Sequence, residues 1–132
     1  MITVRINGVP WKIEGCKEEA EVLKEDDEEV FGITYYGKSE IYVRTENVSE
    51  KVLYRTIVHE LVHAWIYSTG YTEAIAAENS EESVANFMES YGESLLRMAK
   101  KIYKALLPET GIEPKPRIVK KHNKPDYSRI YS

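Results

Sequence analysis

Hydrophobic and polar residues alternate along the first third of the chain, which predicts β-strands there. Residues 2–6 (ITVRI) and 11–15 (WKIEG) follow this two-residue period on either side of the turn sequence NGVP, and they predict a first hairpin. Residues 30–45 (VFGITYYGKSEIYVRT) contain two β-rich runs around YGKS, which predicts a second hairpin. Between the hairpins, residues 17–24 (KEEAEVLK) predict a short helix.

After the second hairpin the apolar residues recur every three or four positions, as they do in amphipathic helices. One helix is predicted over residues 49–69, with Asn47 or Ser49 as its N-cap and Gly70 as its C-cap. A second helix is predicted over residues 79–107, where a proline follows. The expected fold is α+β, in which a small, mostly antiparallel sheet packs on these two long helices.

The last part of the chain differs in composition from the rest. Residues 1–107 are expected to form a single domain, and they carry 12 Lys and Arg against 19 acidic residues. Residues 108–132 contain four of the five prolines, and their six Lys and Arg exceed their three acidic residues. This basic tail is predicted to be either a flexible extension or a strap that packs over the acidic body.

Composition narrows the class of protein. The net charge of −4 does not indicate a nucleic-acid partner. No stretch reaches the ~20 apolar residues that a bilayer span needs, and the amino-terminal segment lacks the apolar run of a signal peptide. Cys16 is the only cysteine, which excludes an intramolecular disulfide and fits a reducing compartment. We therefore expect a cytoplasmic protein without a membrane partner, and the oligomeric state stays open.

Residues 55–67 (RTIVHELVHAWIY) contain the most specific chemical pattern in the chain, H-E-x-x-H. His59 and His63 are one helical turn apart on the same side, so both can bind one Zn²⁺ at ~2.0–2.1 Å. Glu60 lies on the adjacent flank, where it can reach a water on the metal instead of the metal itself. Zinc lowers the pKa of such a water to ~7, and the glutamate can take its proton as a general base.

The simpler interpretation is a buried helix that carries two incidental histidines. In that case the histidines should lie at random relative to the hydrophobic core. Instead, His59 and His63 lie close to the side opposite an apolar stripe. That stripe is formed by Tyr54, Ile57, Leu61 and Trp65. The pattern therefore favours one packing face and one face that is open to a cleft.

A catalytic zinc site needs a third protein ligand. The longer pattern with a third histidine is excluded, because Ile66 and Thr69 occupy the required glycine and histidine positions. His122 lies in the proline-rich tail, which is a poor platform for a rigid ligand. A carboxylate from the first turn of the second long helix remains, and Glu81 and Glu82 are both there.

The segment Glu82-Ser83-Val84-Ala85-Asn86 resembles the E-x-x-[SA]-[DN] segment of the gluzincin metallopeptidases. With the H-E-x-x-H helix, the resemblance covers about residues 30–90, and it extends to proteins of the ImmA/IrrE type and to the minigluzincins. It implies a zincin-like domain with one zinc, bound by His59, His63 and Glu82. Asn86 would orient a ligating histidine. Helical phase places Glu81 nearer the packing side, so Glu81 stays open as the alternative third ligand.

These patterns predict a zinc-dependent metallopeptidase that hydrolyses a peptide or protein substrate, with Glu60 as the general base. An extended peptide is expected to add to the edge of the second hairpin near residues 41–44. A non-catalytic zinc-containing regulatory or binding module of the ImmA/IrrE type is the alternative. A purely structural zinc site is a further one, although it would not need Glu60.

The tail is the source of two further expectations. An oxyanion stabiliser would come from His122, Tyr127 or Tyr131 if the tail folds back. A tail that lies in the cleft would also keep the enzyme latent, in the manner of a zymogen.

Overall fold

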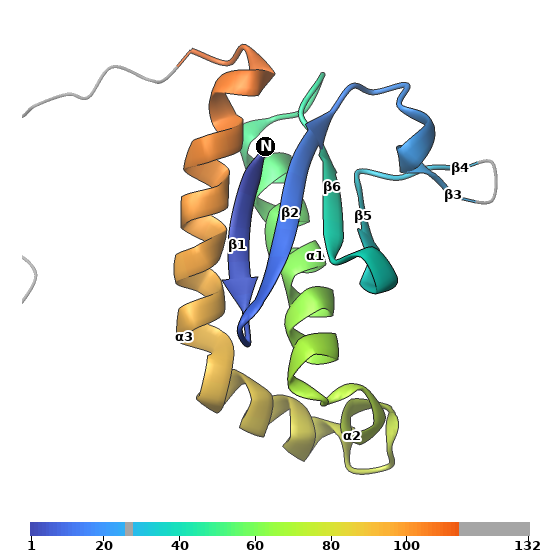
Figure 1. The fold of residues 1–132 in the computed structure, drawn as a ribbon, viewed down its shortest axis with the longest axis vertical. Helices are drawn as coiled ribbons and strands as arrows, with labels where there is room; N and C mark the ends of the chain where they lie inside the picture. Colours follow the sequence, from blue (N-terminus) through green and yellow to red (C-terminus); the bar gives the residue numbers. More distant parts are fainter. Residues whose placement is uncertain (26–27, 114–132) are drawn as a thin grey trace, which may run out of the picture.

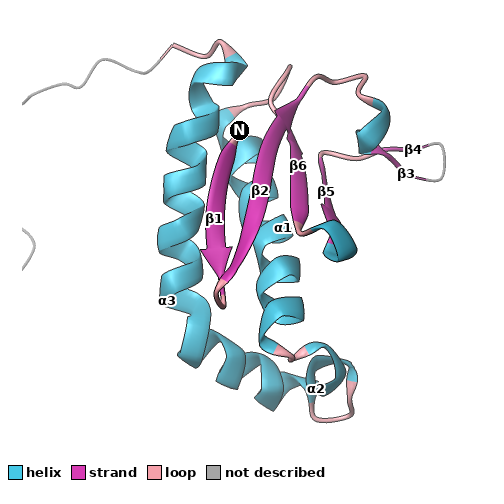
Figure 2. Cartoon of the chain, in the orientation of Figure 1, coloured by secondary structure: helices cyan, strands magenta, loops and turns pink. Residues whose placement is uncertain are grey.

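The computed structural model describes residues 1–25 and 28–113, and it confirms the predicted α+β fold. Figure 1 shows a four-stranded sheet with the long helices α1 (Glu50–Thr69) and α3 (Ser80–Leu106) packed against it. The short helix α2 (Thr72–Ala76) connects them beyond the end of the sheet (Figure 2). Within the described residues, none of the helices is long and apolar enough to cross a membrane.

The sheet has the strand order β1-β2-β6-β5 and is mostly antiparallel, as predicted. The first hairpin joins β1 (Ile2–Ile6) to β2 (Val9–Cys16) through Asn7 and Gly8, which have φ angles of 50° and 80°. Two positive φ angles in a two-residue loop match the right-handed twist of the flanking strands. The second predicted hairpin is also present. It consists of β5 (Gly32–Tyr35), a 3₁₀ turn η2 (Tyr36–Lys38) and β6 (Glu40–Arg44).

The position of β6 corrects one expectation from the sequence. β6 pairs in parallel with β2 on one side and antiparallel with β5 on the other, so it is an interior strand. An extended peptide therefore cannot add at residues 41–44, because the backbone groups there are already paired. The edge of the sheet on this side is β5.

The short helix predicted over residues 17–24 is also wrong. The chain there makes a turn, a single 3₁₀ turn η1 (Glu21–Leu23) and the start of β3 (Lys24–Glu25), which pairs with β4 (Glu28–Glu29). Leu23 is the one residue of the predicted helix that is buried. Eight residues with a single apolar anchor are too few to stabilise a helix in water, so packing of Leu23 decides the local conformation.

Both long helices match their predicted ranges, and their ends show why. The Ser49 hydroxyl oxygen accepts a hydrogen bond from the Val52 amide at 3.1 Å, which satisfies one of the free amides of the first turn of α1. Gly70 ends this helix with a φ of 77°, a conformation that glycine adopts without strain. After α3 comes the 3₁₀ turn η3 (Leu107–Thr110), and the rest of the predicted tail, residues 114–132, lies outside the described residues.

One hydrophobic core lies between the sheet and the two long helices. The side chains of the core that are at most 1% exposed come from β1, β2, β6, α1 and α3: Ile6, Trp11, Ile13, Ile41, Val43, Leu53, Ile57, Leu61, Ala64, Leu95, Ala99, Ile102 and Leu106. The predicted packing stripe of α1 belongs to this core, which fixes the opposite side of that helix as its open face.

Candidate metal centre

The open face of α1 carries both histidines, as the sequence predicted. The His59 side chain is 69% exposed, whereas Ile57 and Leu61 on the packing face are 1% and 0% exposed. Both histidines are therefore on the exposed side of α1 and are not buried with its packing face. Both imidazoles instead border a cleft of about 720 Å³ between α1 and β5.

The Nε2 atoms of the two imidazoles lie close together on the exposed side of α1. His59 Nε2 and His63 Nε2 are 3.2 Å apart, and the ring planes are inclined at 75°. Two nitrogens that each lie ~2.0–2.1 Å from one zinc with tetrahedral angles would be about 3.3–3.4 Å apart. The separation of the two nitrogens is therefore close to that of two corners of a tetrahedral zinc site.

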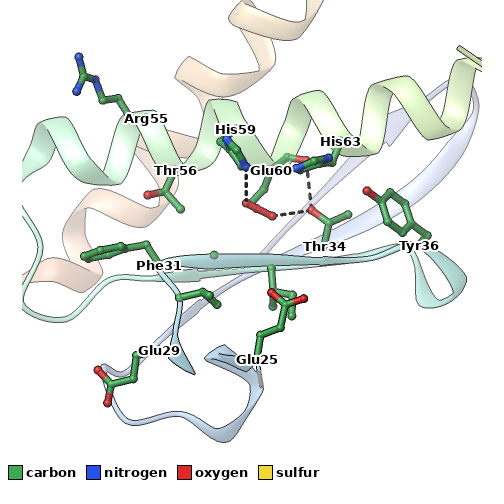
Figure 3. A pocket seen from close by; sticks show the side chains of 13 residues that line it. Glu25, Glu29, Phe31, Thr34, Tyr36, Arg55, Thr56, His59, Glu60 and His63 are labelled. Atoms are coloured by element: carbon green, nitrogen blue, oxygen red, sulfur yellow. Dashed lines mark hydrogen bonds and ion pairs between the residues drawn. The ribbon is translucent and has the colours of Figure 1, made fainter. Parts of the chain in front are cut away.

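Glu60 lies between α1 and the edge strand, and Figure 3 shows its carboxylate next to the histidines. The residue is only 6% exposed. Its Oε2 is 3.9 Å from His59 Nε2, and its Oε1 accepts a hydrogen bond from the Thr34 hydroxyl at 3.0 Å. One carboxylate oxygen is thus turned to His59 and the other to Thr34 on β5.

The close approach of β5 to α1 depends on Gly32. A β-carbon at this position would be 2.7 Å from Thr56 Cγ2 and 2.9 Å from Glu60 Cγ, distances that real β-carbons do not show. A glycine is therefore required at this position because there is no room for a side chain, and not because of its backbone angles.

Sequence reasoning missed both Gly32 and Thr34. Their register partners on β6 are Val43 and Ile41, which are buried, so both residues are on the inner side of the sheet. The sequence signal that could have found them is a glycine and a threonine at positions where a strand facing the core is expected to have apolar residues.

The cleft has aromatic side chains at its two ends and acidic side chains on its far wall. Figure 3 shows Phe31 at one end and Tyr36 at the other, with Glu25 and Glu29 across from α1. Tyr36 packs against Tyr67 of α1, with ring centroids 4.9 Å apart. Partial burial raises the pKa of the Tyr36 hydroxyl, and the negative charge of Glu60 raises it further. Tyr36 therefore stays a hydrogen-bond donor at neutral pH.

The structure does not bring the predicted third ligand to the histidine pair. Glu82 is exposed in the first turn of α3 and does not line the cleft, and the same is true of Glu81. In residues 1–25 and 28–113, no group of three or more His, Cys, Asp or Glu side chains is close enough to hold a metal ion. Asn86 is also exposed. The ligand role of Glu82 and the bound zinc remain predictions.

Three predicted candidates for the oxyanion stabiliser, His122, Tyr127 and Tyr131, lie outside the described residues. The same holds for most of the tail, which the sequence predicts to be either a flexible extension or a strap over the body.

Models of protein families, the curated proteins and the solved structures were each searched, and none of them matches this chain. The resemblance to the gluzincins therefore rests on the two motifs alone.

Proposed function

We propose that this protein is a zinc-dependent metallopeptidase that hydrolyses peptide bonds in extended segments. The observation that supports this best is the 3.2 Å separation of His59 Nε2 and His63 Nε2 beside the Glu60 carboxylate, on the wall of a cleft. A structural zinc site would need the two histidines but not a buried carboxylate next to them.

In this proposal His59 and His63 hold the zinc through their Nε2 atoms. Zinc in such a site supplies a positive charge that acidifies water and polarises a carbonyl group. Glu60 Oε2 takes the proton of the attacking water and then passes it to the amine that leaves. The leaving amine needs this proton because an amide anion is too basic to depart unprotonated. The burial of Glu60 keeps its carboxylate in one position between α1 and β5.

The substrate is proposed to add to β5 as an extra strand. β5 borders the cleft and, in the described part of the chain, pairs with β6 alone, so its outer backbone groups are available to an extended peptide. Main-chain pairing would provide most of the affinity, and Phe31 and Tyr36 at the ends of the cleft would select apolar or aromatic side chains. We propose a cytoplasmic site of action from the single cysteine, Cys16.

Glu82 is kept as the proposed third ligand, with Glu81 as its alternative. Either glutamate would have to lie closer to the histidines than it does here. Figure 1 shows the first turns of α3 extending past the end of the sheet, and none of residues 80–86 is buried. Few packing contacts therefore oppose a displacement of this end of the helix.

A non-catalytic zinc-binding module is the second candidate, because it would use the same histidine pair and would not depend on Glu60 as a base. Metal analysis combined with digestion of an unstructured protein distinguishes the two. The peptidase proposal requires that the wild type binds zinc and cleaves, and that Glu60→Ala keeps zinc but does not cleave. Zinc binding without cleavage by the wild type would favour the binding module, and no zinc binding at neutral pH would exclude both.

A further inference from the structure

Glu60 is the only charged side chain that is buried within residues 1–25 and 28–113. A carboxylate that leaves water needs hydrogen-bond donors to offset its desolvation. Thr34 provides such a donor, since its Oγ1 is 3.0 Å from Glu60 Oε1. The same Oγ1 is 3.3 Å from the Glu60 backbone oxygen. A hydroxyl has one proton, and the carboxylate oxygen is both closer and the stronger acceptor, so the proton goes to Oε1.

The two oxygens of this carboxylate therefore have different surroundings. Oε1 is fixed by Thr34 from the strand, and Oε2 is 3.9 Å from His59 Nε2 on the side of the cleft. Figure 3 shows this arrangement, with the carboxylate lying between Thr34 and His59. The two oxygens belong to one planar carboxylate, so a hydrogen bond that holds Oε1 restricts where Oε2 can lie.

We propose that Thr34 is a positioning residue for the general base. Its hydroxyl holds Oε1, and this aligns Oε2 with the place where the proton of the attacking water is taken. The inference rests on the proposed function, because the role of Glu60 as a base is itself part of that proposal.

The residues on the inner side of β5 support a role for Thr34 beyond packing. Thr34 is paired in register with Ile41, which is 1% exposed, so it lies on the face of the sheet where the neighbouring strand has an apolar side chain. Gly32, two residues earlier on the same side, leaves the space that brings the strand within hydrogen-bond distance of Glu60. Glycine weakens a strand, and here it allows a contact that a larger residue would prevent.

The first part of the test measures the hydrogen bond without any catalysis. Thr34→Val removes the hydroxyl and keeps the shape, and Glu60→Met removes the acceptor at similar length. In the metal-free protein, Thr34→Val should raise the unfolding equilibrium constant about 10- to 100-fold, the scale of a hydrogen bond to a charged group. In the Glu60→Met background, the same change should have an effect of about twofold or less, because both partners are then apolar.

The second part measures catalysis and bound zinc. Thr34→Val should lower kcat about 10- to 100-fold through misalignment of the base, with KM and zinc content unchanged. Thr34→Ser keeps the hydroxyl and should restore most of kcat. Thr69→Val is the matched control, because the Thr69 hydroxyl bonds to the Trp65 backbone oxygen at 2.6 Å near the end of α1 and does not line the cleft. It should keep the wild-type kcat.

The outcomes separate the inference from the function on which it rests. The inference is supported if Thr34→Val has a smaller effect on unfolding in the Glu60→Met background than in the wild type and also shows the predicted loss of kcat. Equal unfolding effects in both backgrounds, a wild-type kcat in Thr34→Val, or loss of zinc from that variant would each overturn the positioning role and leave the peptidase intact. A wild type that binds zinc but never cleaves would overturn the proposed function itself.

Discussion

Gly32 lies so close to Glu60 that a β-carbon on Gly32 would be 2.9 Å from Glu60 Cγ. A single methyl group at this position therefore tests how tightly the edge strand is fitted to α1. Gly32→Ala is expected to lower the free energy of unfolding by about 1–3 kcal/mol, the usual cost of overpacking a filled site. Chemical denaturation of the metal-free protein measures this effect.

Gly37 provides the control for this prediction. It lies in the η2 turn, it has no positive φ, and an added β-carbon would meet nothing within 4 Å. Gly37→Ala should therefore change the free energy of unfolding by less than about 0.5 kcal/mol. Equal stability of the two variants would show that β5 and α1 are not in close contact at Gly32.

The histidine pair leads to a prediction about metal content. We expect one zinc per chain, which His59→Ala or His63→Ala should abolish, because two ligands from one helix turn provide most of the site. Elemental analysis of the purified variants measures this. His122→Ala serves as the comparison and should keep its zinc. Loss of zinc from His122→Ala would instead identify that residue as the missing ligand.

The two glutamates at the start of α3 can be compared directly. Glu82→Gln should weaken zinc binding strongly, and Glu81→Gln should not, if the gluzincin pattern applies to this chain. Asn86→Ala should reduce zinc affinity or activity about 10- to 100-fold, as expected for a residue that orients a ligand. Competition with a chelator gives the affinities. The opposite order for the two glutamates would show that helical phase predicts the ligand better than the motif.

The latency expectation can be tested by truncation after Glu113. Residues 107–113 should be kept, because Leu107 packs against the core and Glu109 lies 3.8 Å from the amino terminus of Met1. An inhibitory tail predicts that the shortened protein cleaves an unstructured substrate faster than the full chain. Thermal unfolding of both proteins checks that the shortened one is folded. Unchanged cleavage by a folded protein would contradict latency.

Local sequence signals predicted the helices well because several of them agree. For α1, the apolar period, the Ser49 cap and Gly70 all give the same ends, and no distant contact competes with them. The segment around Leu23 shows the opposite situation. Its local composition favours a helix, but a single buried side chain and its contacts with the rest of the fold decide the outcome.

The site was predicted only in part, because only some of its contacts are between residues that are close in the sequence. The spacing of His59, Glu60 and His63 is local, so the motif predicted their arrangement on α1. The contact of Thr34 with Glu60 depends on which strand forms the edge of the sheet. That edge is set by the parallel pairing of β2 with β6, which joins residues as distant as Ile13 and Ile41. No periodicity in a single sequence reports such a pairing.

The edge position of β5 also has a consequence for the behaviour of the protein in concentrated solution. Natural sheets protect their outer strands from self-association with charged residues or proline, and β1 on the other edge has Arg5. β5 has the sequence GITY, without a charge or a proline. An edge strand that is proposed to pair with a substrate backbone would therefore also be able to pair with the edge strand of a second copy of the protein. Substrate access at this edge would then come with a greater tendency of the protein to self-associate at high concentration.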